Sequence, residues 1–261
     1  MSRASRHAYA QDLEIAMKLA DCADGITMRY FMNDPGVTVK PDRSLVTIAD
    51  VEAERRMAEI IDGYSATDTI LAEELHSGSV VSGRVWAIDP IDHTNNYARG
   101  LPIFATLISL LVDGRPVVGV VSAPAIGERW WAAKGEGAFS NGRSIEVSRV
   151  SDIRDSHISF AQLEAWQEMG LLQALTGLVG KARWSFGSGG FLAQMWVAEG
   201  KLDVSLDSTG YVWDLAASQI IVEEAGGTFT DVHGMSTPSA GTAIASNGYM
   251  HEEVLRALCL S

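Results

Sequence analysis

Two turn signals in the first half of the chain constrain its fold more than any other feature. Asp113-Gly114 separates the apolar run 104–112 from the run VVGVVSAP, and Asn141-Gly142 divides a second strand-like stretch in the same way. Asp-Gly and Asn-Gly adopt the backbone conformation of a two-residue turn, so each dipeptide between β-branched runs predicts an antiparallel hairpin. The first half should therefore contain an antiparallel sheet.

The remaining segments predict helices packed on sheets. Apolar residues such as Leu13 and Met17 recur at three- and four-residue steps over residues 9–31, and the pattern returns over residues 50–61, which indicates two helices. After about residue 150, strand-like segments such as SHISF and LDVSL alternate with helical ones such as VWDLAASQIIVEEAGG. This alternation favours a layered α/β arrangement. We expect residues 1–150 and 151–261 to form two halves of one compact unit.

The charge and composition of the chain restrict its partners. Its 261 residues carry 33 acidic and 20 basic side chains, a formal net charge of −13. No block of Lys and Arg is present to bind nucleic acid or an anionic membrane, so we expect neither partner. No apolar run approaches the roughly 20 residues of a membrane-spanning helix, and the N-terminus lacks the apolar core of a signal peptide. With two cysteines, Cys22 and Cys259, and no metal-binding spacing, we expect a cytoplasmic protein.

Acidic residues stand at the ends of several apolar segments. They are Asp50, Glu73 with Glu74, Asp89 with Asp92, and Asp214. Any one of them could be a helix cap or a solvated edge. If several converge, however, their burial and mutual repulsion require a cation. Carboxylate oxygens are hard ligands that favour Mg²⁺, and the sequence has no His/Cys spacing for zinc.

The turn after Asp92 could complete such a site with a place for an anion. A helix that begins near Thr94 would direct free N–H groups and a partial positive charge toward the carboxylates. Cations on one side and a helix N-terminus on the other describe a phosphate pocket, in which two cations could activate a water and neutralise the leaving oxygen. We therefore expect a small phosphorylated metabolite as the ligand.

These motifs resemble those of the inositol monophosphatase family of Mg²⁺-dependent, lithium-sensitive phosphatases. WAIDPIDHTNNY is similar to the family's W-x-x-D-P-I/L-D-G-T-x-N-F, and VWDLAASQIIVEEAGG is similar to W-D-x-A-A-x-x-x-I/V-x-x-E-A-G-G. With Glu73 and Glu74, the motifs keep the family's order and separation, and the resemblance covers about residues 10–255. SAPAIGERWWAAKGEGAF is similar to the bacterial histidinol-phosphate phosphatases of the family. The resemblance implies two sheets sandwiched between helices, and a homodimer.

The resemblance also implies roles for individual residues. The ligands of two or three Mg²⁺ ions would be Glu73, Asp89, the Ile91 carbonyl, Asp92 and Asp214. Thr94, held by Asp50, would orient the attacking water together with Glu73. The amides of His93 and Thr94 would bind the phosphate. Lys40, in the mobile segment KPDRS, would approach the site when a further metal binds.

The chain departs from the family pattern at His93, where the family has glycine. Glycine at this point tolerates an unusual φ and leaves room for the anion. The imidazole of His93 could point outward without a role, contact the substrate, or block the phosphate. The sequence leaves these three interpretations open.

Three further differences lie at expected substrate-binding positions. Asn95 stands where the histidinol-phosphate members carry lysine, so one cation is missing. Asp207 takes the place of a glutamate that in relatives reaches the substrate. The segment FGSGGF, which contains Gly190, replaces one with an acidic residue. These differences weaken the case for histidinol phosphate without changing the metal ligands.

The sequence thus predicts a Mg²⁺-dependent phosphatase that acts on a small phosphomonoester. Histidinol phosphate is the first candidate, and a sugar or cyclitol phosphate such as inositol 1-phosphate, from a specialised biosynthetic pathway, is the second. A non-catalytic binding protein, in which His93 blocks the phosphate, is the alternative from a different class.

Overall fold

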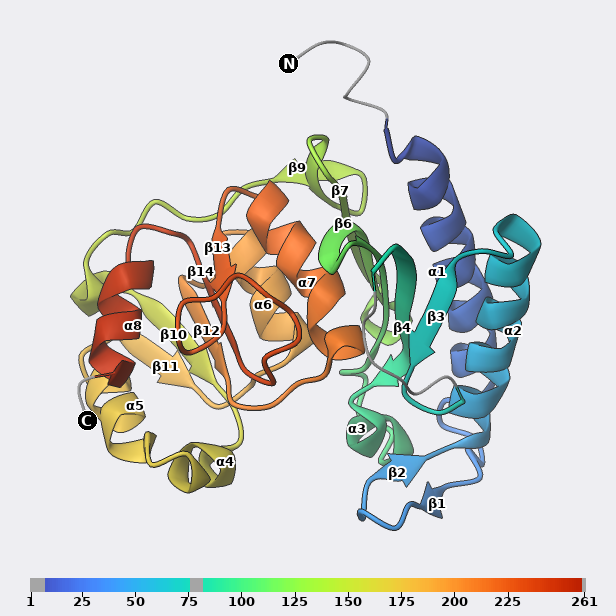
Figure 1. Ribbon diagram of the computed structural model, residues 1–261. Helices are drawn as coiled ribbons and strands as arrows, with labels where there is room; N and C mark the ends of the chain where they lie inside the picture. Colours follow the sequence, from blue (N-terminus) through green and yellow to red (C-terminus); the bar gives the residue numbers. More distant parts are fainter. Residues whose placement is uncertain (1–7, 76–81, 260–261) are drawn as a thin grey trace.

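The computed structural model describes residues 8–75 and 82–259 of the chain (Figure 1). Its α-helices are α1 (Ala10–Tyr30), α2 (Ile48–Tyr64), α3 (Thr94–Ala98), α4 (Leu163–Glu168), α5 (Leu172–Val179), α6 (Phe191–Ala198), α7 (Val212–Glu224) and α8 (His251–Cys259), with 3₁₀ turns at Pro124–Ile126 and Ile153–Asp155. Its strands are β1 (Thr38–Val39), β2 (Leu45–Val46), β3 (Thr69–Ala72), β4 (Arg84–Asp92), β5 (Ala105–Val112), β6 (Arg115–Ala123), β7 (Glu128–Ala133), β8 (Gly137–Ser140), β9 (Arg143–Ile145), β10 (His157–Phe160), β11 (Trp184–Phe186), β12 (Val204–Asp207), β13 (Thr228–Thr230) and β14 (Ala243–Ser246).

These elements form five layers (Figure 1). Helices α1 and α2 cover one face of a seven-stranded sheet, and α6 and α7 lie between that sheet and a five-stranded sheet. Helices α5 and α8 pack on the outer face of the second sheet, where their leucines meet residues of β12 and β14. Each interface between layers is built from buried apolar side chains. The predicted layered fold, with two sheets between helices, is confirmed.

The seven-stranded sheet follows the chain order from β3 to β9. Both predicted hairpins are present: Asp113 and Gly114 have φ of 49° and 77°, and Asn141 and Gly142 have 46° and 81°. Positive φ at both central residues matches the right-handed twist of the strands. The sheet is not wholly antiparallel as expected, because β3 pairs with β4 in parallel. This parallel pair carries Glu73 and the two aspartates of β4 to the same end of the sheet.

The five-stranded sheet has the order β11-β10-β12-β14-β13 and is mixed. Its edge strand β11 is too short to show a periodic pattern and was not predicted. The predicted division near residue 150 falls between β9 and β10, and α7 of the second half packs on the sheet of the first half. The two halves therefore share one helical layer, and the functional site lies beside it.

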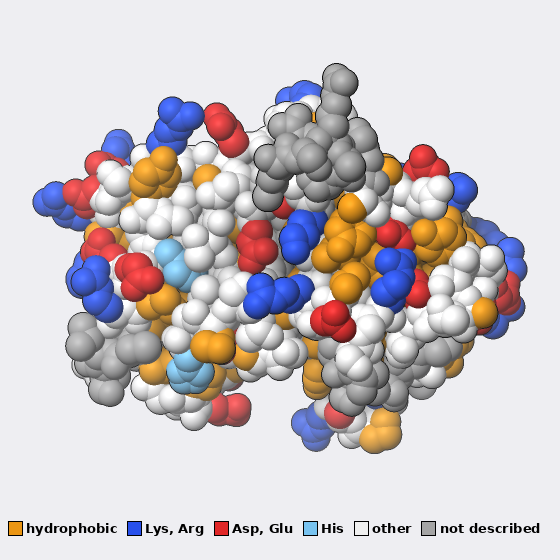
Figure 2. All heavy atoms as spheres, turned by 45° about the horizontal axis from the view of Figure 1, so that its top comes forward, with side chains coloured by type: hydrophobic (Ala, Val, Ile, Leu, Met, Phe, Trp, Pro, Cys, Tyr) orange, Lys and Arg blue, Asp and Glu red, His pale blue; other side chains and the backbone are white. Residues whose placement is uncertain are grey.

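The surface shows no preference for one sign of charge on the face drawn in Figure 2, where Lys and Arg side chains are interspersed with Asp and Glu. None of the helices within the described ranges is long and apolar enough to cross a bilayer.

Candidate functional site

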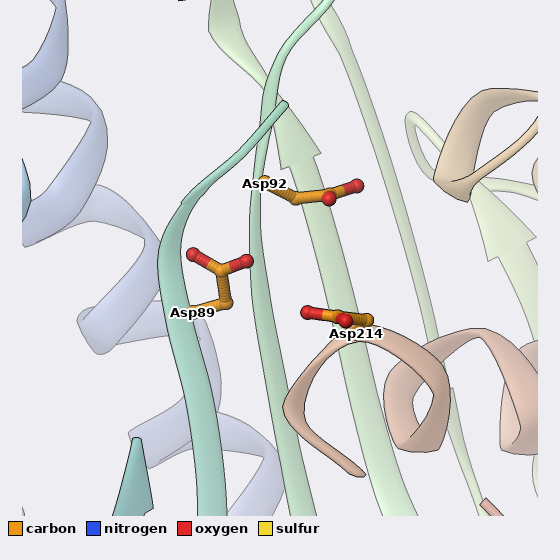
Figure 3. Close-up of side chains that lie close together, drawn as sticks. All are labelled: Asp89, Asp92 and Asp214. Atoms are coloured by element: carbon orange, nitrogen blue, oxygen red, sulfur yellow. The ribbon is translucent and has the colours of Figure 1, made fainter. Parts of the chain in front are cut away.

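Asp89 and Asp92 lie on one side of β4 because the strand is irregular between them. In a regular strand, residues three apart point to opposite faces of the sheet. Here Asp89 pairs with Leu107 and Asp92 with Ala105, so three steps along β4 match two along β5. Pro90, which has no N–H for the ladder, fits such a bulge. The bulge turns Asp92 toward the same side as Asp89 (Figure 3).

Asp214 reaches the same point from the first turn of α7 (Figure 3). The backbone N–H of Tyr211 donates to its Oδ2 at 2.7 Å, which fixes the side chain at the start of the helix. Helix α7 approaches the sheet closely at Gly119: a Cβ there would lie 2.4 Å from Ile220 Cγ2 and 2.7 Å from the Ala217 carbonyl oxygen. The absence of a side chain at Gly119 thus lets α7 bring Asp214 to the end of β4.

The three aspartates form an acidic cluster. One oxygen each from Asp89, Asp92 and Asp214 lies within 4.8 Å of the others. Burial raises the pKa of all three carboxyl groups, and the charges of neighbouring acids raise the pKa of Asp89 and Asp214 further. Like charges held together in a buried place destabilise one another unless a cation joins them. The cluster is therefore suited to bind a divalent cation through oxygen ligands.

Glu73 stands beside this cluster at the end of the neighbouring strand. Its charge contributes to the raised pKa of each of the three aspartates, although its oxygens are not part of the three-oxygen group. Lys40, between β1 and β2, donates from Nζ to Glu73 Oε1 at 2.8 Å and to Glu74 Oε1 at 2.6 Å. Although partial burial opposes it, hydrogen bonds to the two glutamates raise the pKa of Lys40. Lys40 thus brings the segment KPDRS against the site, and its response to a bound metal stays a prediction.

Lys40→Met is expected to destabilise the metal-free protein by about 1–2 kcal/mol at pH 8, because two adjacent carboxylates lose the ammonium group that they share. The loss should be smaller near pH 4.5, because burial raises the pKa of Glu74 and its protonated form needs no counter-charge. Urea denaturation in EDTA measures the difference. Lys181→Met removes an exposed ammonium group after α5 and is the control, with an expected change below about 0.5 kcal/mol. Equal losses in the two variants would contradict this role of Lys40.

Asp50 and Thr94 have other partners than the sequence predicted. Asp50 lies in the first turn of α2, where its Oδ2 accepts from Thr47 N at 2.7 Å and from Thr47 Oγ1 at 2.6 Å. Thr94 Oγ1 donates to the Ile91 carbonyl oxygen at 3.0 Å. No hydrogen bond joins Thr94 to Asp50 in the described part of the chain. The spacing of Thr47 and Asp50 is that of a helix capping box, which is the signal that could have placed Asp50.

Glu54 was missed by the sequence analysis. It is fully buried on α2, and its carboxylate accepts from the backbone N–H of Glu74 at 2.8 Å and of Leu75 at 2.7 Å. These bonds fix the backbone just after β3 and so position Glu73. Nothing in the sequence VEAERR distinguishes Glu54 from a solvated glutamate.

The ring of His93 faces a cavity of about 260 Å³ beside the acidic cluster. His93 precedes α3 with φ 66° and ψ 46°, a left-handed conformation that glycine adopts more easily. The cavity is also lined by Asp92, Asp214 and Gly190. The ring centroid of His93 lies 5.5 Å from that of Phe191, and Nε2 lies 3.9 Å from Asp92 Oδ2. The outward orientation that the sequence left open is therefore not the one observed.

Asp207 anchors the segment around Gly190 through hydrogen bonds. Its carboxylate accepts from the backbone N–H of Gly190 at 2.6 Å, from Gln194 Nε2 at 3.0 Å and from Ser205 Oγ at 3.0 Å. Asp207 thus holds the Gly190 segment in place and also lines the cavity, and its contact with the substrate stays a prediction. Asn95 is exposed on α3 and does not line the cavity formed by the described residues.

Several residues that line the cavity were not singled out in the sequence. Gln162 follows β10, Phe191 begins α6, and Tyr211 precedes α7. Phe191 is the last residue of the segment FGSGGF, and Tyr211 directly precedes VWDLAA, so those two segments were the available signal. Gln162 belongs to a segment without any motif, and its position follows only from the fold.

Comparison with known proteins identifies the family. The model of the inositol monophosphatase family matches residues 8–260. A protein named histidinol-phosphatase from Mycobacterium tuberculosis is 41% identical, with 95% of this chain and 97% of that protein covered. A histidinol-phosphatase from Streptomyces coelicolor is 42% identical, with coverage of 95% and 96%. The structure of an inositol monophosphatase from Anabaena superposes with a TM-score of 0.83 at 31% identity and covers 96% of each chain. With its acidic cluster and its two-sheet fold, this chain belongs to the inositol monophosphatase family of phosphoric monoester hydrolases.

Proposed function

We propose that the protein is a Mg²⁺-dependent phosphatase of a small metabolite, with histidinol phosphate as its first candidate substrate. The family is metal-dependent, and the observation that carries the proposal is the convergence of Asp89, Asp92 and Asp214 at the edge of the cavity. Histidinol phosphate comes first because the relatives at 41% and 42% identity are named histidinol-phosphatase. We also propose a homodimer located in the cytoplasm.

The donor set fits Mg²⁺ better than a softer metal. The acidic cluster offers only carboxylate oxygens, and we propose that the Ile91 carbonyl and Glu73 add further oxygen ligands for two or three ions. Bound Mg²⁺ supplies positive charge that polarises the phosphate, acidifies the attacking water and offsets charge on the leaving oxygen. The raised pKa values of Asp89 and Asp214 support this assignment, because such carboxyl groups gain most from a cation.

The side chains around the cluster would position the reactants. We propose that Thr94 and Glu73 orient the attacking water, since Thr94 Oγ1 lies 3.0 Å from the Ile91 carbonyl and Glu73 follows the adjacent strand. The main-chain amides of His93 and Thr94, at the start of α3, would bind the phosphate oxygens. Lys40 holds Glu73 and would move with the segment KPDRS. The cavity beyond the phosphate is left for the organic group.

A sugar or cyclitol phosphate is the second candidate, and a specific observation favours it. Position 190 carries no acidic side chain, and Asp207 is already hydrogen-bonded to three groups of the protein. At these two places the ammonium group of histidinol phosphate therefore finds only the carboxylate of Asp207, three of whose roughly four acceptor sites are occupied. Neutral hydroxyl groups do not require a carboxylate.

The experiment that tests the proposal is phosphate release from histidinol phosphate, inositol 1-phosphate and a panel of sugar phosphates at saturating Mg²⁺. We expect turnover of at least one of them that EDTA abolishes and added Mg²⁺ restores. The compound from which phosphate is released with the highest kcat/KM is then assigned as the substrate. No release from any compound, together with Mg²⁺ binding in calorimetry, would contradict the proposal and favour a non-catalytic binding protein.

A further inference from the structure

The ring of His93 occupies the space that a side chain at position 190 would need. A Cβ built on Gly190 would lie 2.4 Å from His93 Nε2 and 2.9 Å from His93 Cε1, shorter than real contacts between such atoms. Gly190 also has φ 74° and ψ −160°, a conformation that is essentially restricted to glycine. The space at this point can hold the imidazole at position 93 or a side chain at position 190, but not both.

The Gly189-Gly190 segment, which forms the cavity wall beside His93, is held in place by its neighbours. Besides its bond to Gly190 N, Asp207 faces Gly189, where a Cβ would lie 2.4 Å from Asp207 Oδ1 and 2.2 Å from Ala161 Cβ. The ring of Phe191, at the start of α6, packs beside the imidazole. The Gly189-Gly190 segment therefore cannot withdraw to make room, and the position of the His93 ring is set by the fold.

The hydrogen bonds of Asn96 determine which nitrogen of His93 carries the proton in the neutral ring. Asn96 Nδ2 donates to the Ile103 carbonyl oxygen at 2.8 Å, and since a carbonyl only accepts, this bond fixes the orientation of the amide. The same Nδ2 lies 3.3 Å from His93 Nδ1, which must then accept. The proton is left on Nε2, which makes no hydrogen bond within residues 8–75 and 82–259. His93 thus carries one N–H donor on the ring nitrogen that lies nearest Gly190, at the cavity wall.

The acidic residues of the cavity wall offer little remaining acceptor capacity for a cationic group. In the described chain, those that line it are Asp92, Asp207 and Asp214. Asp92 and Asp214 belong to the acidic cluster, and the carboxylate of Asp207 already accepts three hydrogen bonds. The Nε2–H of His93 is an uncommitted donor beside Gly190, and Gln194 Oε1 is an acceptor of the same wall without a hydrogen-bond partner in the described chain.

We infer that His93 determines substrate specificity by donating a hydrogen bond from Nε2 to an uncharged acceptor on the organic group of the substrate. The inference rests on the proposed function, since it names what the same site selects. A hydroxyl group of a sugar or cyclitol phosphate is one such acceptor. The neutral imidazole nitrogen of histidinol phosphate is another, in which case that ring, and not the ammonium group, lies against His93.

Two pairs of phosphomonoesters separate these acceptors. Inositol 1-phosphate and cyclohexyl phosphate share a six-membered ring but differ in hydroxyl groups. Histidinol phosphate and phenylalaninol phosphate share the ammonium group but differ in the ring nitrogens. Phosphate release at saturating Mg²⁺ gives kcat/KM for all four with the wild type and with two variants. His93→Phe keeps a ring beside Phe191 without the N–H, and His93→Asn tolerates the left-handed backbone but is too short to place a donor at the position of Nε2.

In one of the two pairs, the kcat/KM of the wild type is expected to be at least about tenfold higher for the compound that carries the acceptor than for the other compound. Both variants should reduce that preference to within about twofold. A preference that survives in both variants would overturn the inference, and so would the lack of a preference in either pair. If wild type hydrolyses all four equally and the variants slow all four alike, the proposed function stands and the inference fails. Release from none of the four would refute both.

Discussion

Asp214→Asn is expected to lower kcat/KM for the preferred phosphomonoester by at least about a thousandfold, which corresponds to about 4 kcal/mol of transition-state stabilisation. The variant removes one of the three oxygens that meet in the acidic cluster, and a neutral amide is a poor substitute for a carboxylate ligand of a hard cation. Asn retains an oxygen that can accept from Tyr211 N, so the start of α7 should persist. Steady-state phosphate release at several Mg²⁺ concentrations measures the loss.

Asp113→Asn is the matched control for this variant. It makes the same change of charge in the turn between β5 and β6, at the opposite end of β5 from Ala105, which pairs with Asp92. Asn-Gly forms the same turn as Asp-Gly, so activity should stay within about twofold of the wild type. More than about a tenth of wild-type activity in Asp214→Asn would contradict the assignment of the acidic cluster.

The metal-free protein is expected to lose stability as the pH rises from about 4 to about 7. Burial raises the pKa of Asp50 from its ordinary 3.8 to about 7, although the hydrogen bonds from Thr47 oppose the change. Between these values the folded protein binds one more proton than the unfolded chain, so the free energy of unfolding falls with rising pH and levels off above pH 7. Asp50 alone accounts for up to about 4 kcal/mol. The raised pKa values in the acidic cluster act in the same direction.

Urea denaturation in EDTA at pH 5 and pH 8 checks this expectation, with Asp50→Asn as the control. Asn keeps an acceptor for Thr47 but does not titrate. The decrease in the free energy of unfolding from pH 5 to pH 8 should therefore be markedly smaller in Asp50→Asn than in the wild type. Burial lowers the pKa of His251, which opposes the trend on the acidic side, but this contribution is shared by both proteins and cancels in the comparison. Saturating Mg²⁺ should restore stability at pH 8 by binding the folded state. Two results would contradict the account. One is a wild type that is more stable at pH 8 than at pH 5 in EDTA, and the other is an equal change in the free energy of unfolding between the two pH values in the wild type and in Asp50→Asn.

Much of the fold could be predicted because its signals are local. The turns at Gly114 and Gly142 need a backbone conformation that few residues adopt, and the sequence shows that requirement directly. Asp214 could be included in the candidate site because its motif VWDLAASQIIVEEAGG resembles that of the inositol monophosphatase family. Asp50 could have been placed in the same way, since Thr47 and Asp50 have capping-box spacing.

The cavity wall could not be predicted because it depends on contacts between distant segments. That the ring of His93 lies where a side chain at Gly190 would be follows only from how the residues before α3 and α6 meet in the fold. The hydrogen bond of Asp207 to the Gly190 amide was not predicted, because a sequence does not show which backbone amides a side chain will meet. The face on which Asp92 lies depends on one extra residue in β4, which the pairing with β5 reveals.

The central claim is that the acidic cluster and the start of α3 together bind a cation and a phosphate. A crystal structure with Mn²⁺ in place of Mg²⁺ and with inorganic phosphate tests it most directly, because anomalous scattering locates the metal independently of the model. The account predicts an anomalous peak within about 2.6 Å of an oxygen of each of Asp89, Asp92 and Asp214, with a phosphate oxygen bound to the same ion on the side of His93. An anomalous peak elsewhere, or a phosphate bound away from the metal, would contradict it.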